Sequence, residues 1–322
     1  LNGNYYNLLD KKTLKWQAEL ARKNGIYGFC YYHYWFDGHM LMEKPMEIML
    51  NNQEVDLPFC ICWANENWTK AWAKKSKEVL ISQTYGDQKD WKEHFDYLLP
   101  FFKDKRYIKV DGKPFFVIYR PEIVGCLRDM LEYWQQLAKE NGFPGLTFAY
   151  QQTDYDHRKA ETGDLFDYGI EYQPATVRNR PQKRNPFLLT RKCLNVFVNK
   201  FKLPQTRMST FWYSYDDAWK KIIKMNPKDD KMLPGAFVDW DNTPRYGKQA
   251  SIYLGVTPEK FEKYLSLQIK HVKNVYHKDM IFMFAWNEWG EGGYLEPDEK
   301  YGYAMLKAIR NALIENDEFP KY

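Results

Sequence analysis

Short, continuous apolar runs recur along the chain, and each is followed by a polar or helix-forming stretch. Uninterrupted apolar runs of this length are typical of strands that are buried on both faces. They cover residues 28–34, 58–64, 114–119, 146–151, 168–172, 235–238 and 281–286. Helices are predicted between and after them, over 13–23, 87–102, 126–141, 257–275 and 301–316. This alternation predicts an α/β fold in which helices cover a parallel sheet.

Clusters of potential ligands follow nearly every predicted strand. They include 32–35, 63–68, 119–120, 150–152, 171–173, 239–241 and 286–288. A closed (β/α)8 barrel of the TIM type gathers all strand ends around one mouth, whereas an open doubly wound sheet gathers ligands mainly at one switch point. Seven contributing strand ends favour the barrel. The chain has no Gly-x-Gly-x-x-Gly segment, which argues against a dinucleotide site.

The bulk composition is that of a globular protein without a membrane span. Hydrophobic residues make up 44% and charged residues 28% of the 322 positions. No apolar run approaches the roughly 18 residues that a spanning helix needs. We therefore expect a single barrel domain over residues 1–322, with a basic insertion at about 173–232. Among the five cysteines, Cys60 and Cys62 share one face of a strand, and reduced thiols are favoured over disulfides or a metal site.

The net charge of +5 is concentrated in one segment. Between residues 173 and 214 there are nine basic side chains and no acidic one, so the rest of the chain is net acidic. The nine are Arg178, Arg180, Lys183, Arg184, Arg191, Lys192, Lys200, Lys202 and Arg207. This pattern fits an anionic partner, such as a charged glycan or a lipid carrier, and equally fits a solvated insertion. Nucleic acid is not expected, because no binding motif accompanies the charge.

Two glutamates, Glu288 and Glu291, follow the last apolar run and stand beside Trp286 and Trp289. Carboxylates lose several kcal/mol on desolvation unless they are paired, so their place at the end of a buried strand needs a reason. Breaking or making a glycosidic bond uses such a pair, one as proton donor and the other as base or nucleophile. In a helix the two Cβ atoms would lie about 5–6 Å apart, which favours retention. The alternative is a polar turn that begins a helix.

Other strand-end residues complete the expected substrate-binding set, and no metal or cofactor is predicted. Glu66 competes for a catalytic role, but it equally fits a structural ion pair with Arg120 or Lys70. His33 suits a sugar hydroxyl or a carboxylate, or a structural role, and Asp239, Asp241 and Arg245 suit sugar hydroxyls or an internal turn. The set is Tyr32, His33, Trp35, Trp63, Asn65, Glu66, Trp68, Tyr119, Arg120, Gln151, Tyr172, Asp239, Asp241, Arg245, Trp286, Asn287 and Trp289.

Five segments together resemble the bacterial WbsX-like proteins, which are associated with lipopolysaccharide and polysaccharide biosynthesis and are similar to glycoside hydrolase family 99. The segments are 28–36, 59–68, 111–115, 240–245 and 287–292. The resemblance implies a (β/α)8 barrel and an endo-acting α-mannosidase-type activity with retention. It also implies that Glu288 is the base that assists the substrate's own 2-hydroxyl, through a 1,2-anhydro sugar, and that Glu291 is the general acid and then base.

The resemblance leaves alternatives open. A glycosyltransferase of surface-polysaccharide assembly is the second reading, and a catalytically silent glycan-binding barrel is the third. Proteins of this kind carry an N-terminal stretch with the first barrel strand, and the present sequence starts after it, so we expect a barrel that lacks this strand. The chain begins at Leu1 without a signal-peptide pattern. A bacterial cytoplasmic location is favoured, and export is the alternative if a signal precedes this segment.

Overall fold

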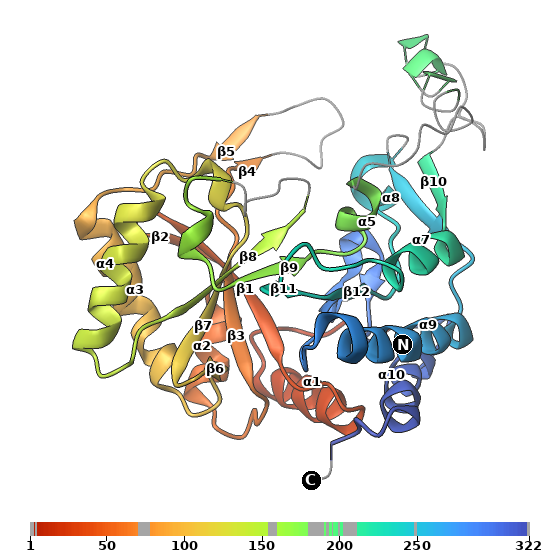
Figure 1. Cartoon of the computed structure of the whole chain (residues 1–322), viewed down its shortest axis with the longest axis horizontal. Coiled ribbons are helices and arrows are strands. Elements are labelled where there is room, and N and C mark those ends of the chain that lie inside the picture. Colours follow the sequence, from red (N-terminus) through yellow and green to blue (C-terminus); the bar gives the residue numbers. More distant parts are fainter. Residues whose placement is uncertain are drawn as a thin grey trace.

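Parallel strands in chain order form the centre of the molecule (Figure 1). The computed structural model describes residues 3, 5–69, 78–153, 160–179, 211–247 and 250–320, with several positions between 190 and 201. The ladder runs through β1 (Phe29–Phe36), β3 (Phe59–Trp63), β7 (Lys113–Ile118), β8 (Thr147–Gln152), β9 (Tyr168–Glu171) and β11 (Met232–Leu233). Every predicted strand is present, displaced by at most a few residues at its ends.

The chain passes from this ladder into a second one around Pro234. β12 (Gly235–Phe237) follows β11 and pairs in parallel with β14 (Phe282–Phe284). Proline has no backbone N–H and interrupts a ladder, but its carbonyl accepts a hydrogen bond from Phe282 N–H at 3.1 Å. Within the described residues no backbone pairing joins β14 to β1. The rings of Phe29 and Trp286 instead meet across that seam, with centroids 4.9 Å apart.

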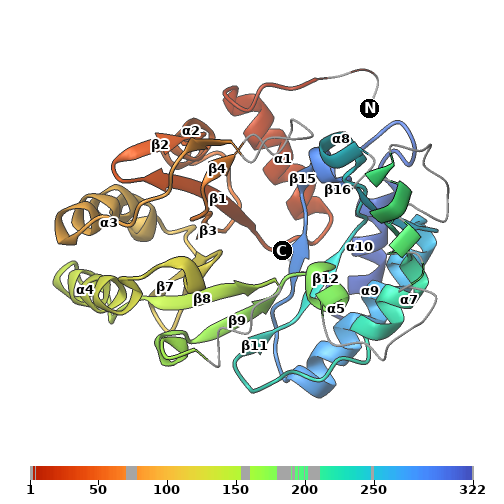
Figure 2. The ribbon, with the colours of Figure 1, turned by 90° about the horizontal axis from the view of Figure 1, so that it is seen from above.

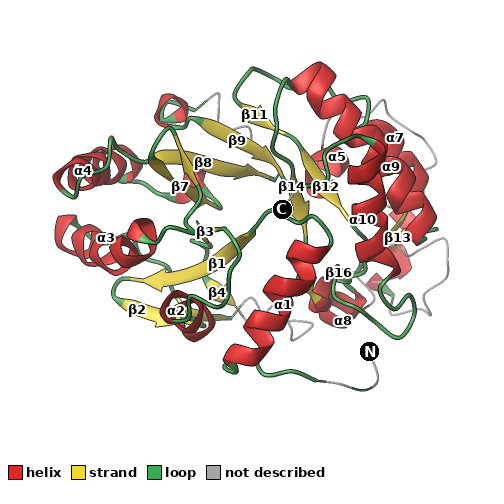
Figure 3. Ribbon diagram, turned by 90° about the horizontal axis from the view of Figure 1, so that it is seen from below, coloured by secondary structure: helices red, strands yellow, loops and turns green. Residues whose placement is uncertain are grey.

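Helices lie outside the strands, as Figures 2 and 3 show from opposite ends. They are α1 (Lys11–Lys23), α2 (Lys44–Asn51), α3 (Gln88–Lys103), α4 (Leu127–Glu140), α5 (Ala175–Asn179), α7 (Tyr215–Ile222), α8 (Thr243–Tyr246), α9 (Pro258–His271) and α10 (Ala304–Glu315). The expected α/β architecture of the (β/α)8 type is thus confirmed, although the described strands form no closed ladder. No helix in the described ranges is both long and apolar enough to cross a bilayer.

The remaining strands in the described residues are short. They are β2 (His39–Leu41), β4 (Trp68–Thr69), β5 (Val79–Ile81), β6 (Lys109–Val110), β10 (Phe211–Ser214), β13 (Ser251–Leu254), β15 (Asn287–Glu288) and β16 (Gly293–Tyr294). The predicted basic insertion lies between β9 and β12 and contains α5, β10 and α7. Of the nine basic residues between 173 and 214, Arg178 and Lys200 belong to the described part, and the other seven lie outside it.

Local sequence signals explain several helix ends. Thr257 caps α9, its hydroxyl accepting from Lys260 N–H, and Pro258 occupies the first turn. α4 ends at Asn141, and Gly142 follows with a φ of +88°, a conformation that favours glycine. Both signals confirm the predicted helix limits. α2 and α7, by contrast, were not among the predicted helices.

Candidate active site

A tight hairpin carries the two glutamates at the end of β14. β15 pairs antiparallel with β16, and a single helical turn over Trp289–Glu291 joins them. Gly292 closes the turn with a φ of +66°. A Cβ there would lie 2.8 Å from the backbone nitrogen of Asp241, so both the conformation and the close approach require glycine. The spacing argument that assumed a helix after Trp286 therefore does not apply to this hairpin.

The guanidinium of Arg245 contacts the carboxylates of both Glu288 and Glu291. Its Nη1 lies 2.7 Å from Oε1 of Glu291, and its Nη2 lies 3.6 Å from Oε1 of Glu288. Burial raises the pKa of Glu288; the positive charge of Arg245 opposes this rise and the negative charge of Glu291 adds to it. Glu288 and Glu291, the predicted catalytic pair, thus share one guanidinium at the mouth of the strands.

The loop that carries Arg245 is tied to the same hairpin. Asp241 N–H donates to the carbonyl of Glu291 at 2.8 Å, and the Asp241 carboxylate accepts from Thr243 N–H at 2.9 Å. Asn242 accepts from Ser251 N–H at 2.8 Å. Asp241, predicted to bind substrate, therefore uses one carboxylate oxygen to start α8 and so helps to place Arg245.

A row of tyrosines lines the strand ends beside the carboxylates. Tyr32 meets Tyr119 edge to face at 6.2 Å between ring centroids, and Tyr119 meets Tyr172 at the same distance. The Tyr32 hydroxyl donates to the Gln151 amide oxygen at 3.2 Å. Burial first, then the neighbours Tyr119, Glu291 and Glu288, raise the pKa of the Tyr172 phenol. The structure thus brings Tyr32, Tyr119, Gln151 and Tyr172 together, and the row reaches the glutamate pair.

Tyr34 belongs to this group; it lies in the predicted ligand cluster 32–35 but was not in the predicted substrate-binding set. Burial and the nearby charge of Glu288 raise its pKa to about 12, while Arg245 opposes that rise. Its ring contacts the edge of Trp68 at 5.0 Å. Strand alternation would have identified it, because Tyr32 and Tyr34 are two positions apart on one face of β1.

The same alternation turns His33, Trp35 and Trp63 away from the mouth. His33 and His94 of α3 share a hydrogen bond between their Nε2 atoms at 2.9 Å, and Trp35 stacks on His94 with centroids 4.6 Å apart. Trp63 donates from Nε1 to the Trp35 carbonyl. His33, Trp35 and Trp63 are 2%, 5% and 2% exposed. They pack between the sheet and α3 and do not join the other predicted site residues.

Asn65, Glu66 and Arg120 form a separate corner at the ends of β3 and β7. Asn65 is fully buried and exchanges two 2.8 Å hydrogen bonds with the backbone of Arg120. The Arg120 guanidinium contacts Glu66 at 2.9 Å and also contacts Glu122. The ion-pair alternative for Glu66 is present in the structure. Burial first, and then the negative charges of Glu66 and Glu291, raise the pKa of Tyr119, while Arg120 opposes this rise.

The aromatic residues around the hairpin differ in exposure. Trp289 is 41% exposed and stacks on Tyr294. Trp286 turns toward the seam with Phe29, and Asn287 is exposed at the start of β15. Trp289 is thus the hairpin's accessible aromatic surface beside Glu288.

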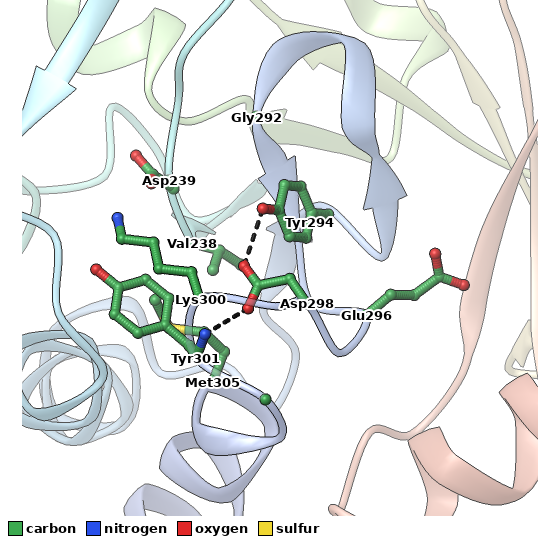
Figure 4. A pocket seen from close by; sticks show the side chains of 10 residues that line it. Val238, Asp239, Gly292, Tyr294, Glu296, Asp298, Lys300, Tyr301 and Met305 are labelled. Atoms are coloured by element: carbon green, nitrogen blue, oxygen red, sulfur yellow. Dashed lines mark hydrogen bonds between the residues drawn. The ribbon is translucent and has the colours of Figure 1, made fainter. Parts of the chain in front are cut away.

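Asp239 faces a small pocket behind the hairpin, drawn in Figure 4. The pocket has a volume of about 40 Å³, and Tyr294, Asp298 and Lys300 help to line it. Burial raises the pKa of Asp239 to about 7, and the nearby Lys300 opposes this rise. Asp298 accepts from the Tyr294 hydroxyl at 2.9 Å. Within the described ranges no cluster of His, Cys, Asp or Glu is arranged to hold a metal ion.

The chain is similar in fold to several solved structures, among them the two that follow. The chain aligns with the family 99 endo-α-mannosidase of Bacteroides thetaiotaomicron at a TM-score of 0.54 and 12% identity, covering 97% of this chain and 81% of that one. A glycoside hydrolase-like protein aligns at 0.58 and 12% identity, over 100% and 91% of the two chains. At 12% sequence identity, this structural similarity shows a shared fold alone.

Comparisons of sequence place the chain among known proteins. Proteins named WxcX from two strains of Xanthomonas campestris pv. campestris are each 29% identical over 96% of this chain. The chain spans 42% of their length. The family model described as glycosyltransferase WbsX matches residues 1–309. With that match over nearly its whole length, the chain belongs to the WbsX family.

Proposed function

We propose that the protein is a retaining α-glycoside hydrolase, endo-α-mannosidase-like, that acts within a bacterial or other complex glycan. One observation carries the proposal: Arg245 holds Glu288 and Glu291 together at the strand ends, beside a row of tyrosine rings. The carboxyl pair supplies an acid and a base, and the rings supply apolar faces for the C–H surfaces of a sugar. The family and the glycosidase-like fold support a glycan as the substrate.

The roles within the pair follow from the resemblance. Glu288 acts as the base that deprotonates the 2-hydroxyl of the sugar, and this oxygen displaces the leaving group to form a 1,2-anhydro sugar. Glu291 gives its proton to the departing oxygen. It later takes one from the water that attacks the anomeric carbon, while the bond from that carbon to the 2-oxygen breaks and Glu288 returns its proton to the 2-oxygen. Two inversions at the anomeric carbon then give retention. The raised pKa of Tyr172, whose phenol faces both carboxylates, keeps that phenol neutral and able to donate a hydrogen bond to a sugar oxygen.

A glycosyltransferase is the second candidate function, and the description of the matching family favours it. The two functions are separated by one screen. The protein is incubated with a panel of mannose-containing and bacterial glycans, with nucleotide-sugar donors in parallel reactions, and the products are analysed by mass and anomeric configuration. Shortened glycans without a donor support hydrolysis. Extension that requires a donor supports transfer, and intact glycans in all reactions reject both.

The basic segment is proposed to bind an anionic glycan or carrier. Arg178, in its described part, lies over the Trp240 ring at 6.0 Å and contacts the Ser251 hydroxyl at 3.5 Å. Replacing Arg178, Arg180, Lys183 and Arg184 with serine should weaken binding to an anionic glycan and flatten its salt dependence. The same binding curve at each salt concentration for parent and variant would show a merely solvated segment.

A further inference from the structure

Arg245 contacts both carboxylates unequally. The closer contact, 2.7 Å, is to Glu291, whose side chain is 13% exposed. The longer one, 3.6 Å, is to Glu288, whose side chain is 32% exposed. A guanidinium presents its donors in a rigid planar fork, so two simultaneous contacts restrict how the two carboxyl groups lie relative to each other.

The hairpin closes directly over this guanidinium. A Cβ at Gly290 would lie 3.2 Å from Arg245 Nε and 3.4 Å from Glu288 Oε1. Any larger residue there presses on the arginine or on the carboxylate. On its other side Arg245 is held by α8, which Asp241 ties to the carbonyl of Glu291. The arginine is therefore fixed by the same hairpin that carries the two acids.

In the part of the chain that the structure describes, the titratable side chains near the pair include three phenols at strand ends. They belong to Tyr34, Tyr119 and Tyr172, and burial raises the pKa of each. All three are neutral at neutral pH. The positive charge of Arg245 therefore acts on the pair without a competing charge from these three side chains.

We propose that Arg245 is the positioning residue of the carboxyl pair, with two separable effects. Its guanidinium fixes the arrangement of Glu288 and Glu291, and its charge favours the ionised form of the nearby Glu288 carboxylate. This role differs from the hydroxyl binding expected from the sequence. Its catalytic meaning rests on the proposed function, but the effect on proton uptake does not.

The charge effect is tested without substrate. The glutamate carboxyl carbons are labelled and their titration is followed by NMR in the parent, Arg245→Gln and Arg245→Lys proteins. Glu288→Gln and Glu291→Gln assign the signals. We expect Arg245→Gln to move the titration of Glu288 upward by about one pH unit or more, and Arg245→Lys to restore most of the shift. Unshifted titration in a folded Arg245→Gln protein overturns the proposal.

The fork effect is tested with a glycan that the screen identifies. Arg245→Lys should keep the pH limits of activity but lower kcat by about tenfold or more, because an ammonium lacks the planar fork. Arg245→Gln should also move the acidic limb of the pH profile upward. Arg128→Gln is the matched control, since Arg128 on α4 makes a 2.7 Å ion pair with Asp164, on the outside of the molecule.

The two tests separate this inference from the proposed function. A shifted titration with no glycan turned over rejects the proposed function and supports the charge effect. Turnover of a glycan together with an unshifted titration supports the proposed function and rejects the charge effect. Equal kcat and equal pH limits in the lysine variant and the parent would reject the fork. Circular dichroism of each variant establishes that it is folded before the titrations are compared.

Discussion

The indole ring of Trp289 stacks on the phenol ring of Tyr294, with 3.8 Å between centroids and 17° between planes. Trp289 also donates from Nε1 to the buried Glu296 carboxylate at 2.8 Å. Glu296 accepts two further hydrogen bonds, from the Tyr6 hydroxyl and the Gln17 amide, both at 2.6 Å. One face of an exposed tryptophan is thus held in place from behind, which suits it as a platform for a sugar ring.

Replacing Trp289 with alanine should weaken glycan binding by about tenfold, equivalent to about 1.4 kcal/mol. The loss follows because the ring face is already ordered and binding sugar costs little side-chain entropy. Calorimetric titration with a glycan from the screen measures it. Tyr27→Ala, which removes an exposed ring from the loop before β1, is the control and should bind as the parent does. Parental affinity in Trp289→Ala would exclude the platform.

Glu291→Gln should abolish turnover of glycans with poor leaving groups, with a loss of about a hundredfold or more. Activated aryl glycosides should keep part of their rate, because their leaving groups need little protonation. Steady-state kinetics on both substrate types measures the difference. Glu66→Gln is the matched variant at the other corner of the mouth and should affect both types alike. An equal loss on both types in Glu291→Gln argues against its role as the acid.

The mechanism proposed for Glu288 predicts that no ester forms between sugar and protein. A 2-fluoro glycoside lacks the internal nucleophile, so it should be inert and leave the protein mass unchanged. A direct carboxylate nucleophile would instead give a slowly hydrolysed adduct. Intact-mass spectrometry after incubation distinguishes the two. An adduct mapped to Glu288 or Glu66 would overturn the neighbouring-group mechanism.

The buried pair His33 and His94 should make stability depend on pH. Burial lowers the pKa of His33 to about 3, and that of His94 also falls below its ordinary value. Between about pH 6.5 and the lowered values, the unfolded chain binds protons that the folded chain does not, so stability falls as the pH falls. The slope should approach about 1.4 kcal/mol per pH unit for each histidine.

Urea unfolding at several pH values between about 7 and 4 measures this slope. His94→Gln should flatten it, and His39→Gln, at an exposed position on β2, should leave it unchanged. The comparison is made between the slopes of variant and parent, because carboxylates elsewhere add their own pH dependence. A parental slope in His94→Gln would place the acid sensitivity in other groups.

Strands and their order could be predicted because each is a continuous apolar run, which depends on local sequence alone. The site could be predicted in part. Glu288 and Glu291 were found from their spacing, and Tyr32, Tyr119 and Tyr172 from their place at strand ends. His33, Trp35 and Trp63 were predicted with them because all side chains at a strand end were assumed to face the mouth. Which side of a strand each side chain occupies needs the alternation to be applied residue by residue.

Other features depend on contacts between distant segments. The hairpin turn packs against the backbone of Asp241, which leaves no room for a side chain at Gly292. The glycines near Glu291 do not by themselves predict this contact. Arg245 reaches two carboxylates more than forty positions along the chain. The histidine pair depends on α3 packing across β1. Such contacts leave no local pattern, and a single sequence gives no means of pairing them.

Successive side chains of β1 point to opposite faces of the sheet, so neighbouring residues have different roles. Tyr32 and Tyr34 face the mouth, whereas His33 and Trp35 pack against α3. Mutations at the first pair can therefore alter the surface offered to a sugar while the layer between β1 and α3 keeps its packing. A library restricted to mouth-facing positions should yield a high share of folded proteins with altered glycan preference. In evolutionary terms, specificity can drift here one residue at a time without passing through unfolded intermediates.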